Sequence, residues 1–392
     1  MVGMTTQPWT RMLSSQLGLP LLLALSLAVM ACSSDEAVGT PAADSSADAV
    51  IETDLEAEDE LEAETDPEAE TEDEPQTETE LDGQDLLALD LFLDGALVGD
   101  PALGDCELSD GSQSQCYMVT VVGTPVNHDV GPFCPTDISQ DSDAGGLWLD
   151  GVDSFEIDGA FFTELSDIYG DELWDNIYND DGTINVIDNA ADFQVAARPD
   201  ITEEFYYHCV DGDVTWLDGG EQPTHTIEVP AVPALADEAT VQFATGAHSN
   251  LGVTLNGALL SGSADMTAIL ASYTIAAFDD CGGHINPALG YHVHGTAGCS
   301  DVGETADGET APFAYAIDGF TIHAPYEAGV DVELDECNGH VSEEYGYHYH
   351  AASLEENATL TCLNGLTAAG QDAGGRPARP DGERPARPEP QD

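Results

Sequence analysis

The stretch DCGGHINPALGYHVH (residues 280–294) recurs as ECNGHVSEEYGYHYH (residues 336–350), 56 positions further along the chain. Both copies fit the pattern C-x-G-H-x6-Y-H-x-H, which chance rarely produces twice at one spacing. Each copy follows a phrase typical of a strand and a turn, residues 252–257 before the first and residues 314–319 before the second. The sequence therefore predicts a duplicated unit whose two copies pack about a pseudo-twofold axis.

Short strands dominate the fold that we expect around this repeat. Candidate strands such as residues 347–350 are only a few residues long, and Gly, Asp and Asn separate them. Helical stretches are few, with residues 161–169 and 171–178 as the main candidates. We expect a mainly β body with short helices, in which the repeat units span about 250–298 and 312–354.

The paired histidines of the repeat carry the functional argument. Side chains two positions apart in a strand lie on the same face, so His292 and His294 share a face, as do His348 and His350. If the two strands pair or face each other, the four imidazoles converge. Imidazole binds copper and zinc well, so the sequence predicts a transition-metal site with these four ligands.

Other residues could support that site, and other interpretations remain open. His284 and His340 are candidates for further ligands or for orienting the four; Asp318 offers a carboxylate, and His128 is a further candidate. Alternatively, the histidines are hydrogen-bonded parts of a core without metal. The two C-x-x-H pairs of the repeat could also form a zinc site.

Residues 179–188 resemble a calcium-binding loop. Aligning Gly182 with the glycine of such a loop puts Asn179, Asp181, Asn185 and Asp188 at ligand positions. The first ligand position, which requires Asp, then falls on Ile177. We therefore do not expect calcium to be a cofactor.

The doubled phrase resembles the bacterial YHYH-domain family of exported proteins, and residues 347–350 (YHYH) carry that resemblance most directly. Residues 125–133 (PVNHDVGPF) are similar to an early phrase of the same family, and the likeness covers about 115–365. The first copy departs from the full signature, because Val293 stands where the family has Tyr. The resemblance implies an exported protein and a fold neighbourhood, and it implies little about mechanism.

The cysteines indicate an oxidising compartment. Nine are present, and setting aside Cys32 leaves an even number, as expected of a disulfide framework. The eight are Cys106, Cys116, Cys134, Cys209, Cys281, Cys299, Cys337 and Cys362. We expect Cys106 to pair with Cys116 and Cys134 with Cys209. The last four should pair among themselves, with a Cys281–Cys337 bridge joining the repeats.

The beginning of the chain resembles a bacterial lipoprotein leader. An apolar run from Leu17 to Met30 follows Arg11 and ends at Ala31-Cys32-Ser33, where Cys32 would be lipidated. The alternative is an ordinary signal peptide with a chance cysteine. We expect a signal peptide over 1–31, an acidic disordered tether over 32–89, the body over 90–368 and a disordered Pro/Arg-rich tail over 369–392. The mature protein would be anchored to the lipid bilayer of the cell envelope, at the outer membrane or the cell surface, through acylated Cys32.

Charge excludes one class of partner. The chain has 6 Lys+Arg against 77 Asp+Glu, a formal net charge of −71, so it lacks the basic face that nucleic-acid binding needs. Its surface should instead accumulate cations, and its self-repulsion should destabilise it at low salt. Within the body, Arg198 is the one fixed cation.

Three functions fit these observations. We favour binding of copper or zinc through the duplicated histidines. A metal-dependent hydrolase or oxidase that uses the same residues is the enzymatic alternative, and a surface interaction module with structural histidines is the third. The chain has no P-loop, no G-x-S-x-G motif and no dinucleotide fingerprint in a strand context.

Overall fold

The computed structural model describes residues 87–371 except 199–200, 240, 243–249, 297–298, 300–308, 327–329 and 331, and it describes residues 241–242 by their backbone alone. The expected signal peptide with Cys32, the acidic tether through residue 86 and the tail from residue 372 lie outside the described residues. Within the described part, no helix is long and apolar enough to cross a membrane.

Strands form most of the regular structure, which confirms the expected mainly β class. The strands are β1 (Ala102–Glu107), β2 (Gln113–Val121), β3 (Leu147–Leu149), β4 (Ser154–Glu156), β5 (Val186–Ile187), β6 (Cys209–Val210), β7 (His225–Pro230), β8 (Val241–Gln242), β9 (Asn250–Thr254), β10 (Leu259–Ser261), β11 (Gly283–Asn286), β12 (Gly290–Val293), β13 (Pro312–Ala316), β14 (Thr321–His323), β15 (Gly339–Ser342), β16 (Gly346–His350) and β17 (Cys362–Leu363).

The helices are short and lie mostly before the repeat. They are α1 (Gly159–Tyr169), α2 (Ala190–Ala196) and α3 (Met266–Ala271), with 3-10 turns η1 (Leu89–Leu91), η2 (Ser142–Ala144), η3 (Glu172–Ile177), η4 (Glu203–Phe205), η5 (Val214–Trp216) and η6 (Leu354–Glu356). The α1 helix begins where the Asp158 carboxylate accepts a hydrogen bond from the N–H of Phe161, and it ends at Gly170 in the left-handed conformation. Both expected helical stretches are thus present, as α1 and η3.

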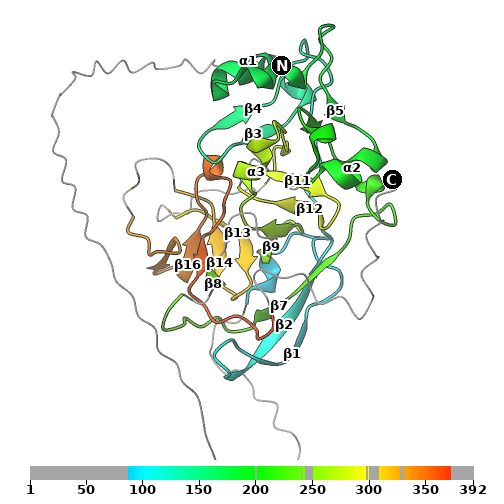
Figure 1. Cartoon of the computed structure of the whole chain (residues 1–392). Helices are drawn as coiled ribbons and strands as arrows, with labels where there is room; N and C mark the ends of the chain where they lie inside the picture. The colour runs from blue at the N-terminus through cyan, green and yellow to red at the C-terminus, as the bar shows by residue number, and fades with distance from the viewer. Residues whose placement is uncertain are drawn as a thin grey trace, which may run out of the picture. The chain divides into compact units, whose positions relative to one another are not determined.

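An eight-stranded sheet in the order β11-β12-β10-β9-β13-β14-β16-β15 contains both copies of the repeat (Figure 1). At its centre β9 pairs with β13 in antiparallel fashion. Outward from this pair, each half makes an antiparallel, then a parallel, then an antiparallel pairing. The order is therefore symmetric about an axis between β9 and β13, and the predicted pseudo-twofold repeat is confirmed.

The two halves differ in one connection. The outer hairpins are related by an offset of 56 residues, whereas β9 and β10 precede β13 and β14 by 62 residues. The segment that joins β10 to β11 is accordingly six residues longer than the one that joins β14 to β15, and it contains α3. The first repeat thus carries a helix beside its hairpin.

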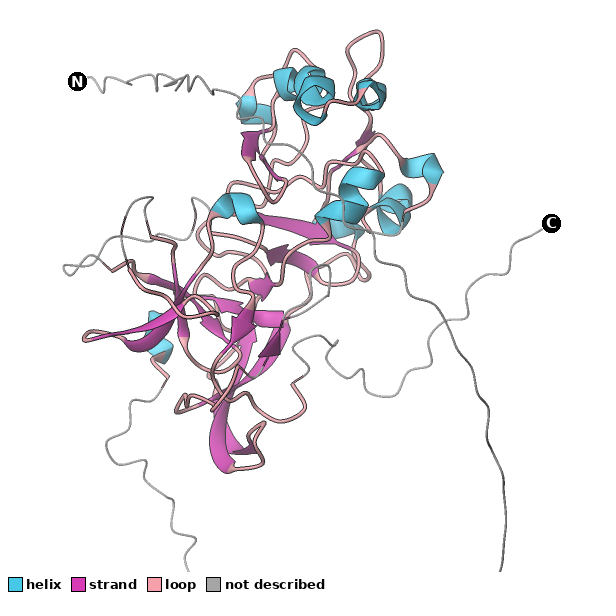
Figure 2. Cartoon of the chain, turned by 60° about the vertical axis from the view of Figure 1, so that its left-hand side comes forward, coloured by secondary structure: helices cyan, strands magenta, loops and turns pink. Residues whose placement is uncertain are grey.

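The segments before the repeat form smaller sheets and most of the helical turns. The strands β1, β2 and β7 make a three-stranded antiparallel sheet, and most helical turns gather at the other end of the body (Figure 2). Trp148 is fully buried, and its indole N–H donates to the hydroxyl of Tyr169 over 2.7 Å. One continuous apolar core joins this part to the large sheet.

Four disulfides crosslink the described part of the chain. Cys106–Cys116 and Cys134–Cys209 are the pairs that we expected, and the last four cysteines pair among themselves as Cys281–Cys299 and Cys337–Cys362. The predicted Cys281–Cys337 bridge is wrong. Cys281 precedes β11 and Cys337 precedes β15, which are the two edge strands of the sheet. Seven steps of about 4.8 Å separate these edges, far beyond the roughly 7 Å that a disulfide can span.

Candidate metal centres

Each YHxH strand belongs to a hairpin that gathers three histidines. In the β11–β12 hairpin His284 lies directly opposite His292, and in β15–β16 His340 lies opposite His348. Paired positions share a face, and a residue two positions further on shares it too. The third histidine of each copy therefore joins the pair, and each hairpin presents three imidazoles on one face.

The turn before each hairpin is organised by an aspartate that the sequence analysis did not single out. The Asp279 carboxylate accepts the N–H groups of Cys281 and Gly283, over 3.1 Å each. Asp335 does the same for the equivalent residues of the second copy, over 2.9 and 2.8 Å. A tyrosine hydroxyl of the YHxH strand also donates to each carboxylate. The signal in the sequence was an Asp two positions before Cys in both copies.

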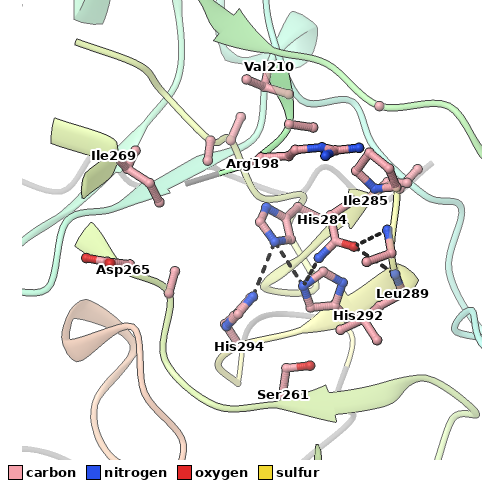
Figure 3. Close-up of a pocket in the computed structure, with 18 of the residues that line it drawn as sticks. Arg198, Val210, Ser261, Asp265, Ile269, His284, Ile285, Leu289, His292 and His294 are labelled. Atoms are coloured by element: carbon pink, nitrogen blue, oxygen red, sulfur yellow. Dashed lines mark hydrogen bonds between the residues drawn. The ribbon is translucent and has the colours of Figure 1, made fainter. Parts of the chain in front are cut away.

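The first triad consists of His284, His292 and His294 (Figure 3). His284 Nε2 lies 3.1 Å from His292 Nε2 and 3.2 Å from His294 Nε2. The amide nitrogen of Asn286 lies 3.3 Å from His292 Nε2. The three rings line a cavity of about 770 Å³. This triad can hold a metal ion and leave one side of it facing the cavity.

The second triad consists of His340, His348 and His350, and Glu309 completes it. The three Nε2 atoms lie 3.0 to 3.1 Å apart. One carboxylate oxygen of Glu309 lies 3.4 to 3.5 Å from all three. The four atoms form a nearly regular tetrahedron, whose centre lies about 2.0 Å from each corner, the usual length of bonds from zinc to nitrogen and oxygen.

Backbone carbonyls fix the tautomer of the ligand rings. The Nδ1 of His348 lies 3.1 Å from the carbonyl oxygen of Gly346, and the Nδ1 of His350 lies 3.0 Å from that of Ala324. A carbonyl only accepts, so each Nδ1 must carry the hydrogen. In the neutral rings both Nε2 atoms then present lone pairs, and these lie 3.1 Å apart with no hydrogen between them. A cation between the two atoms removes this repulsion.

The first triad repeats this arrangement. The Nδ1 of His292 lies 2.9 Å from the carbonyl oxygen of Gly290, and the Nδ1 of His294 lies 2.6 Å from that of Gly262. Carbonyl partners of this kind are the usual supports of metal-binding histidines, because they hold the ring and its tautomer in place.

Burial disfavours the charged form of four of the triad rings. It lowers the pKa of His284 and His292 well below the ordinary value of 6.5, and neighbouring imidazoles lower both further. Burial also lowers the pKa of His348, and it lowers that of His350 to about 4. Burial alone would raise the pKa of Glu309, but a hydrogen bond from a tyrosine and the nearby imidazoles outweigh it and lower that pKa. Neutral imidazoles and an ionised carboxylate are the forms that bind metal.

The two YHxH strands do not face each other. Four strands separate β12 from β16 in the sheet, which amounts to about 24 Å at about 4.8 Å per step. The expected convergence of His292 and His294 with His348 and His350 is therefore wrong. The structure instead divides the six repeat histidines between two triads, in which His284 and His340 are full members.

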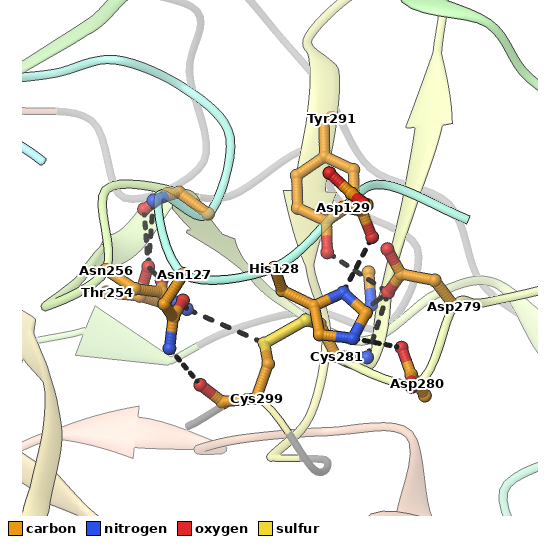
Figure 4. Close-up of a disulfide and its surroundings, with 12 residues drawn as sticks. Asn127, His128, Asp129, Thr254, Asn256, Asp279, Asp280, Cys281, Tyr291 and Cys299 are labelled. Carbon is orange, nitrogen blue, oxygen red and sulfur yellow. Dashed lines mark hydrogen bonds and ion pairs between the residues drawn. A yellow bond between two sulfur atoms is a disulfide. The ribbon is translucent and has the colours of Figure 1, made fainter. Parts of the chain in front are cut away.

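The supporting residues proposed from the sequence lie elsewhere. Asp318 is buried beneath Tyr349, whose hydroxyl donates to it over 2.6 Å, and burial raises the pKa of Asp318 to about 6. His128 lies 3.1 Å from the Asp280 carboxylate, beside the disulfide of Cys281 (Figure 4). Neither residue belongs to a triad.

The C-x-x-H zinc hypothesis is also wrong, because both of its cysteines are in disulfides. A disulfide sulfur is not the thiolate that zinc requires. Two further clusters of possible metal ligands contain disulfide cysteines, and the same argument counts against them as metal sites. They are Cys106, Cys116 and Glu228, and His128, Asp280 and Cys281.

The calcium-like loop is closed by its own side chains. Asp181 accepts hydrogen bonds from the backbone and hydroxyl of Thr183, over 3.2 and 2.7 Å. The Asn179 amide donates to Asn185 over 3.0 Å. These bonds are those of an ordinary acidic turn.

Three residues at the second triad were not identified as site residues from the sequence. The Tyr326 hydroxyl donates to Glu309 over 2.6 Å, and its ring stacks on His350 at 4.1 Å. His323 packs its ring 4.3 Å from that of His348, and its Nδ1 contacts the carbonyl oxygen of Thr310. Glu309 and Tyr326 lie outside the doubled phrase, so the repeat gave no signal for them. His323 lies outside the doubled phrase too.

Comparisons with known proteins do not identify a relative with such centres. No protein-family model, no curated protein and no solved structure matches the chain. The function must therefore be argued from the two triads themselves.

Proposed function

We propose that the protein binds two transition-metal ions, one at each triad. The observation that carries this proposal is the pair of Nε2 atoms of His348 and His350, 3.1 Å apart with both Nδ1 atoms bonded to carbonyls. Two neutral imidazoles that hold such atoms together in a buried place need a cation between them. The oxygen of Glu309 at the fourth corner adds the charge that such a cation favours.

Zinc and copper are the metals that we propose. Three imidazoles and one carboxylate oxygen in a tetrahedron are a donor set that suits zinc. Three imidazoles with an open side suit zinc or copper. The acidic chain would raise the concentration of either cation at its surface.

Metal analysis of protein purified without an affinity tag tests the proposal. We expect two ions per wild-type chain. The variant with His292→Ala and His294→Ala should keep one, and so should the variant with His348→Ala and His350→Ala. All four substitutions together should leave none.

His208→Ala is the matched control, because His208 lies outside both triads and its Nδ1 bonds to a backbone carbonyl in the same way. This variant should keep two ions. Wild-type protein without stoichiometric metal would refute the proposal and leave an interaction module with structural histidines as the alternative.

The cavity beside the first triad favours a second candidate function. A metal with three protein ligands and an open side is the arrangement of catalytic rather than structural sites. The protein could then be a metal-dependent hydrolase or oxidase. Turnover of ester, phosphoester or amine substrates that depends on His292 and His294, and survives loss of His340, would support it. Two bound ions without turnover of any of these substrates would favour binding alone.

We also propose that the chain is an exported, lipid-anchored protein of the YHYH-domain family. The apolar run before Cys32, the YHYH phrase at residues 347–350 and the four disulfides support this proposal. Expression of Cys32→Ala tests the anchor. The substituted protein should move from the membrane fraction to the soluble fraction, whereas an ordinary signal peptide would give the same fractionation with and without the substitution.

A further inference from the structure

The two triads are alike, but their surroundings differ at three matched positions. Shifting by 62 residues places Ser261 at the position of His323, and Ala264 at the position of Tyr326. The same shift places Ala247, which lies outside the described residues, at the position of Glu309. In the second repeat these three positions carry the side chains that fill the space around the metal centre. In the first repeat they carry small residues.

The small residues and α3 leave a cavity beside the first triad. Its volume is about 770 Å³, within the range of small-molecule sites, and Ser261 and Ala264 both line it. Ser261 is 3% exposed, and its hydroxyl has no hydrogen-bond partner among the described residues. A buried hydroxyl without a partner costs free energy unless something bound in the cavity accepts its hydrogen. This residue therefore points to a ligand.

Arg198 lines the same cavity (Figure 3). It is the one Lys or Arg between positions 12 and 375 of the chain. Within the described ranges no carboxylate lies within 4 Å of its guanidinium, since the ion pairs found there all involve histidine. Its side chain is exposed, so in so acidic a chain an arginine that lines a cavity and has no described carboxylate partner can meet an anion from outside.

The charge of the first centre leads to the same conclusion. Its three candidate ligands are imidazoles, which bind metal in their neutral form, so a divalent ion there would keep its full charge, whereas Glu309 would offset part of that charge at the second centre. The amide nitrogen of Asn286, a hydrogen-bond donor, lies 3.3 Å from His292 Nε2 in the same triad. Asp265 lines the cavity, but its carboxylate caps α3 by accepting the N–H of Ala268. With an ion at the first triad, the cavity would present a cation together with several hydrogen-bond donors.

We propose that this cavity binds a small dianionic molecule whose two charged groups are carboxylates or phosphates. One anionic group would face the metal of the first triad and the hydroxyl of Ser261, and the other would face Arg198. The inference rests on the proposed function, because it requires an ion at the first triad. It deepens that function by assigning a ligand class to the first centre and none to the second.

Titration calorimetry on the full zinc-loaded chain, at constant ionic strength, tests the inference. The probes are malonate, succinate, glutarate and inorganic phosphate, with acetate as the monoanionic reference. We expect at least one dianion to bind tenfold or more tightly than acetate. Arg198→Gln should weaken that dianion at least tenfold and acetate much less. Arg376→Gln is the matched control, because it removes the same charge from the tail.

Two substitutions at Ser261 separate shape from hydrogen bonding. Ser261→Ala should weaken the dianion severalfold, because it removes one donor. Ser261→His copies the second repeat and should abolish binding by filling the cavity, while two zinc ions per chain remain. Cobalt-loaded protein adds a readout, since the dianion should change the visible spectrum in wild type but not after Ser261→His.

Metal content separates the two ways in which the experiment can fail. Fewer than two ions per wild-type chain would overturn the proposed function and this inference with it. Two ions with no dianion bound more tightly than acetate would overturn the inference alone. Equal binding by zinc-loaded and metal-free protein, or by wild type and Arg198→Gln, would also overturn it. Binding of a dicarboxylate would identify the spacing of the two groups, whereas binding of inorganic phosphate, which has one charged group, without any dicarboxylate would overturn the inference.

Discussion

The two repeats build the same triad and surround it differently. In both, a hairpin puts three imidazoles on one face and an aspartate holds the turn before it. Around the second triad Glu309, His323 and Tyr326 fill the space, whereas a cavity lies beside the first. Structural metal sites are closed and reactive ones keep an open position. The hairpin therefore specifies that an ion can bind, and the flanking strands specify what else can reach it.

The largest expected effect is on stability. His348→Ala should lower the free energy of unfolding in excess zinc by about 4 kcal/mol or more, because it breaks a closed site and leaves the buried Glu309 carboxylate without its cation. His292→Ala should cost roughly half as much, because water in the cavity can replace the lost ligand. Urea unfolding with His208→Ala as control checks both. Equal losses at the two triads would contradict the distinction between closed and open centres.

The disulfides should affect the two halves alike. The Cys281–Cys299 and Cys337–Cys362 disulfides each crosslink the turn before one hairpin, with sequence separations of 18 and 25 residues. On loop closure alone, replacing either pair by serine should cost about 3 kcal/mol, with a difference of only about 0.3 kcal/mol between them. Thermal unfolding of the two double variants measures this. A much larger loss at either one would show that the turns differ in more than their ligands.

Glu309→Gln tests whether the carboxylate closes the second centre. The amide keeps the shape of the side chain and removes its charge, so zinc affinity at the second centre should fall about 10- to 100-fold. The first centre should be unaffected. Competition with a chelator measures both affinities, and Glu336→Gln, at an exposed glutamate beside the same hairpin, is the control. An unchanged zinc affinity at the second centre would mean that Glu309 does not bind the ion.

The hairpin part of the site could be predicted further than it was. In the pattern G-H-x6-Y-H the two histidines are equidistant from residue 288, and a hairpin centred there pairs His284 with His292. With that pairing, three histidines per copy follow from strand geometry alone. The sequence analysis considered the YHxH strand by itself, and therefore expected the two copies to supply one common site.

The rest of the site could not be found from local pattern. Glu309 is one acidic residue among 77, in a segment outside the doubled phrase. The pairings of β13 with β14 and of β14 with β16 bring its neighbourhood to the triad. Arg198 was noted for its rarity, but its place beside the first triad depends on tertiary packing. The mainly β class and two of the four disulfides followed from composition and spacing. The other two pairs depended on which strands lie at the edges of the sheet.

The smallest expected effect concerns the matched aspartates, and it depends on pH. Burial raises the pKa of Asp279 from 3.8 to about 6, whereas Asp335 is exposed. The folded protein therefore holds the Asp279 proton more tightly than the unfolded chain does. The cost of ionising this buried group is absent below about pH 3.8, grows as the pH rises and is complete above about pH 6.

Asp279→Asn removes that cost and keeps the Oδ1 that accepts from Cys281, Gly283 and Tyr291. It loses the 3.3 Å bond that the N–H of Gly131 donates to Oδ2, so the test is the change of stability with pH and not its absolute value. The difference in free energy of unfolding between Asp279→Asn and wild type should therefore shift in favour of the variant by about 1–2 kcal/mol as the pH rises from 4 to 8. Urea unfolding of metal-free protein across this range measures the change. Asp335→Asn is the matched variant at the exposed turn. If the free energy of unfolding of both variants changed with pH in the same way, the two aspartates would not differ in burial as the structure indicates.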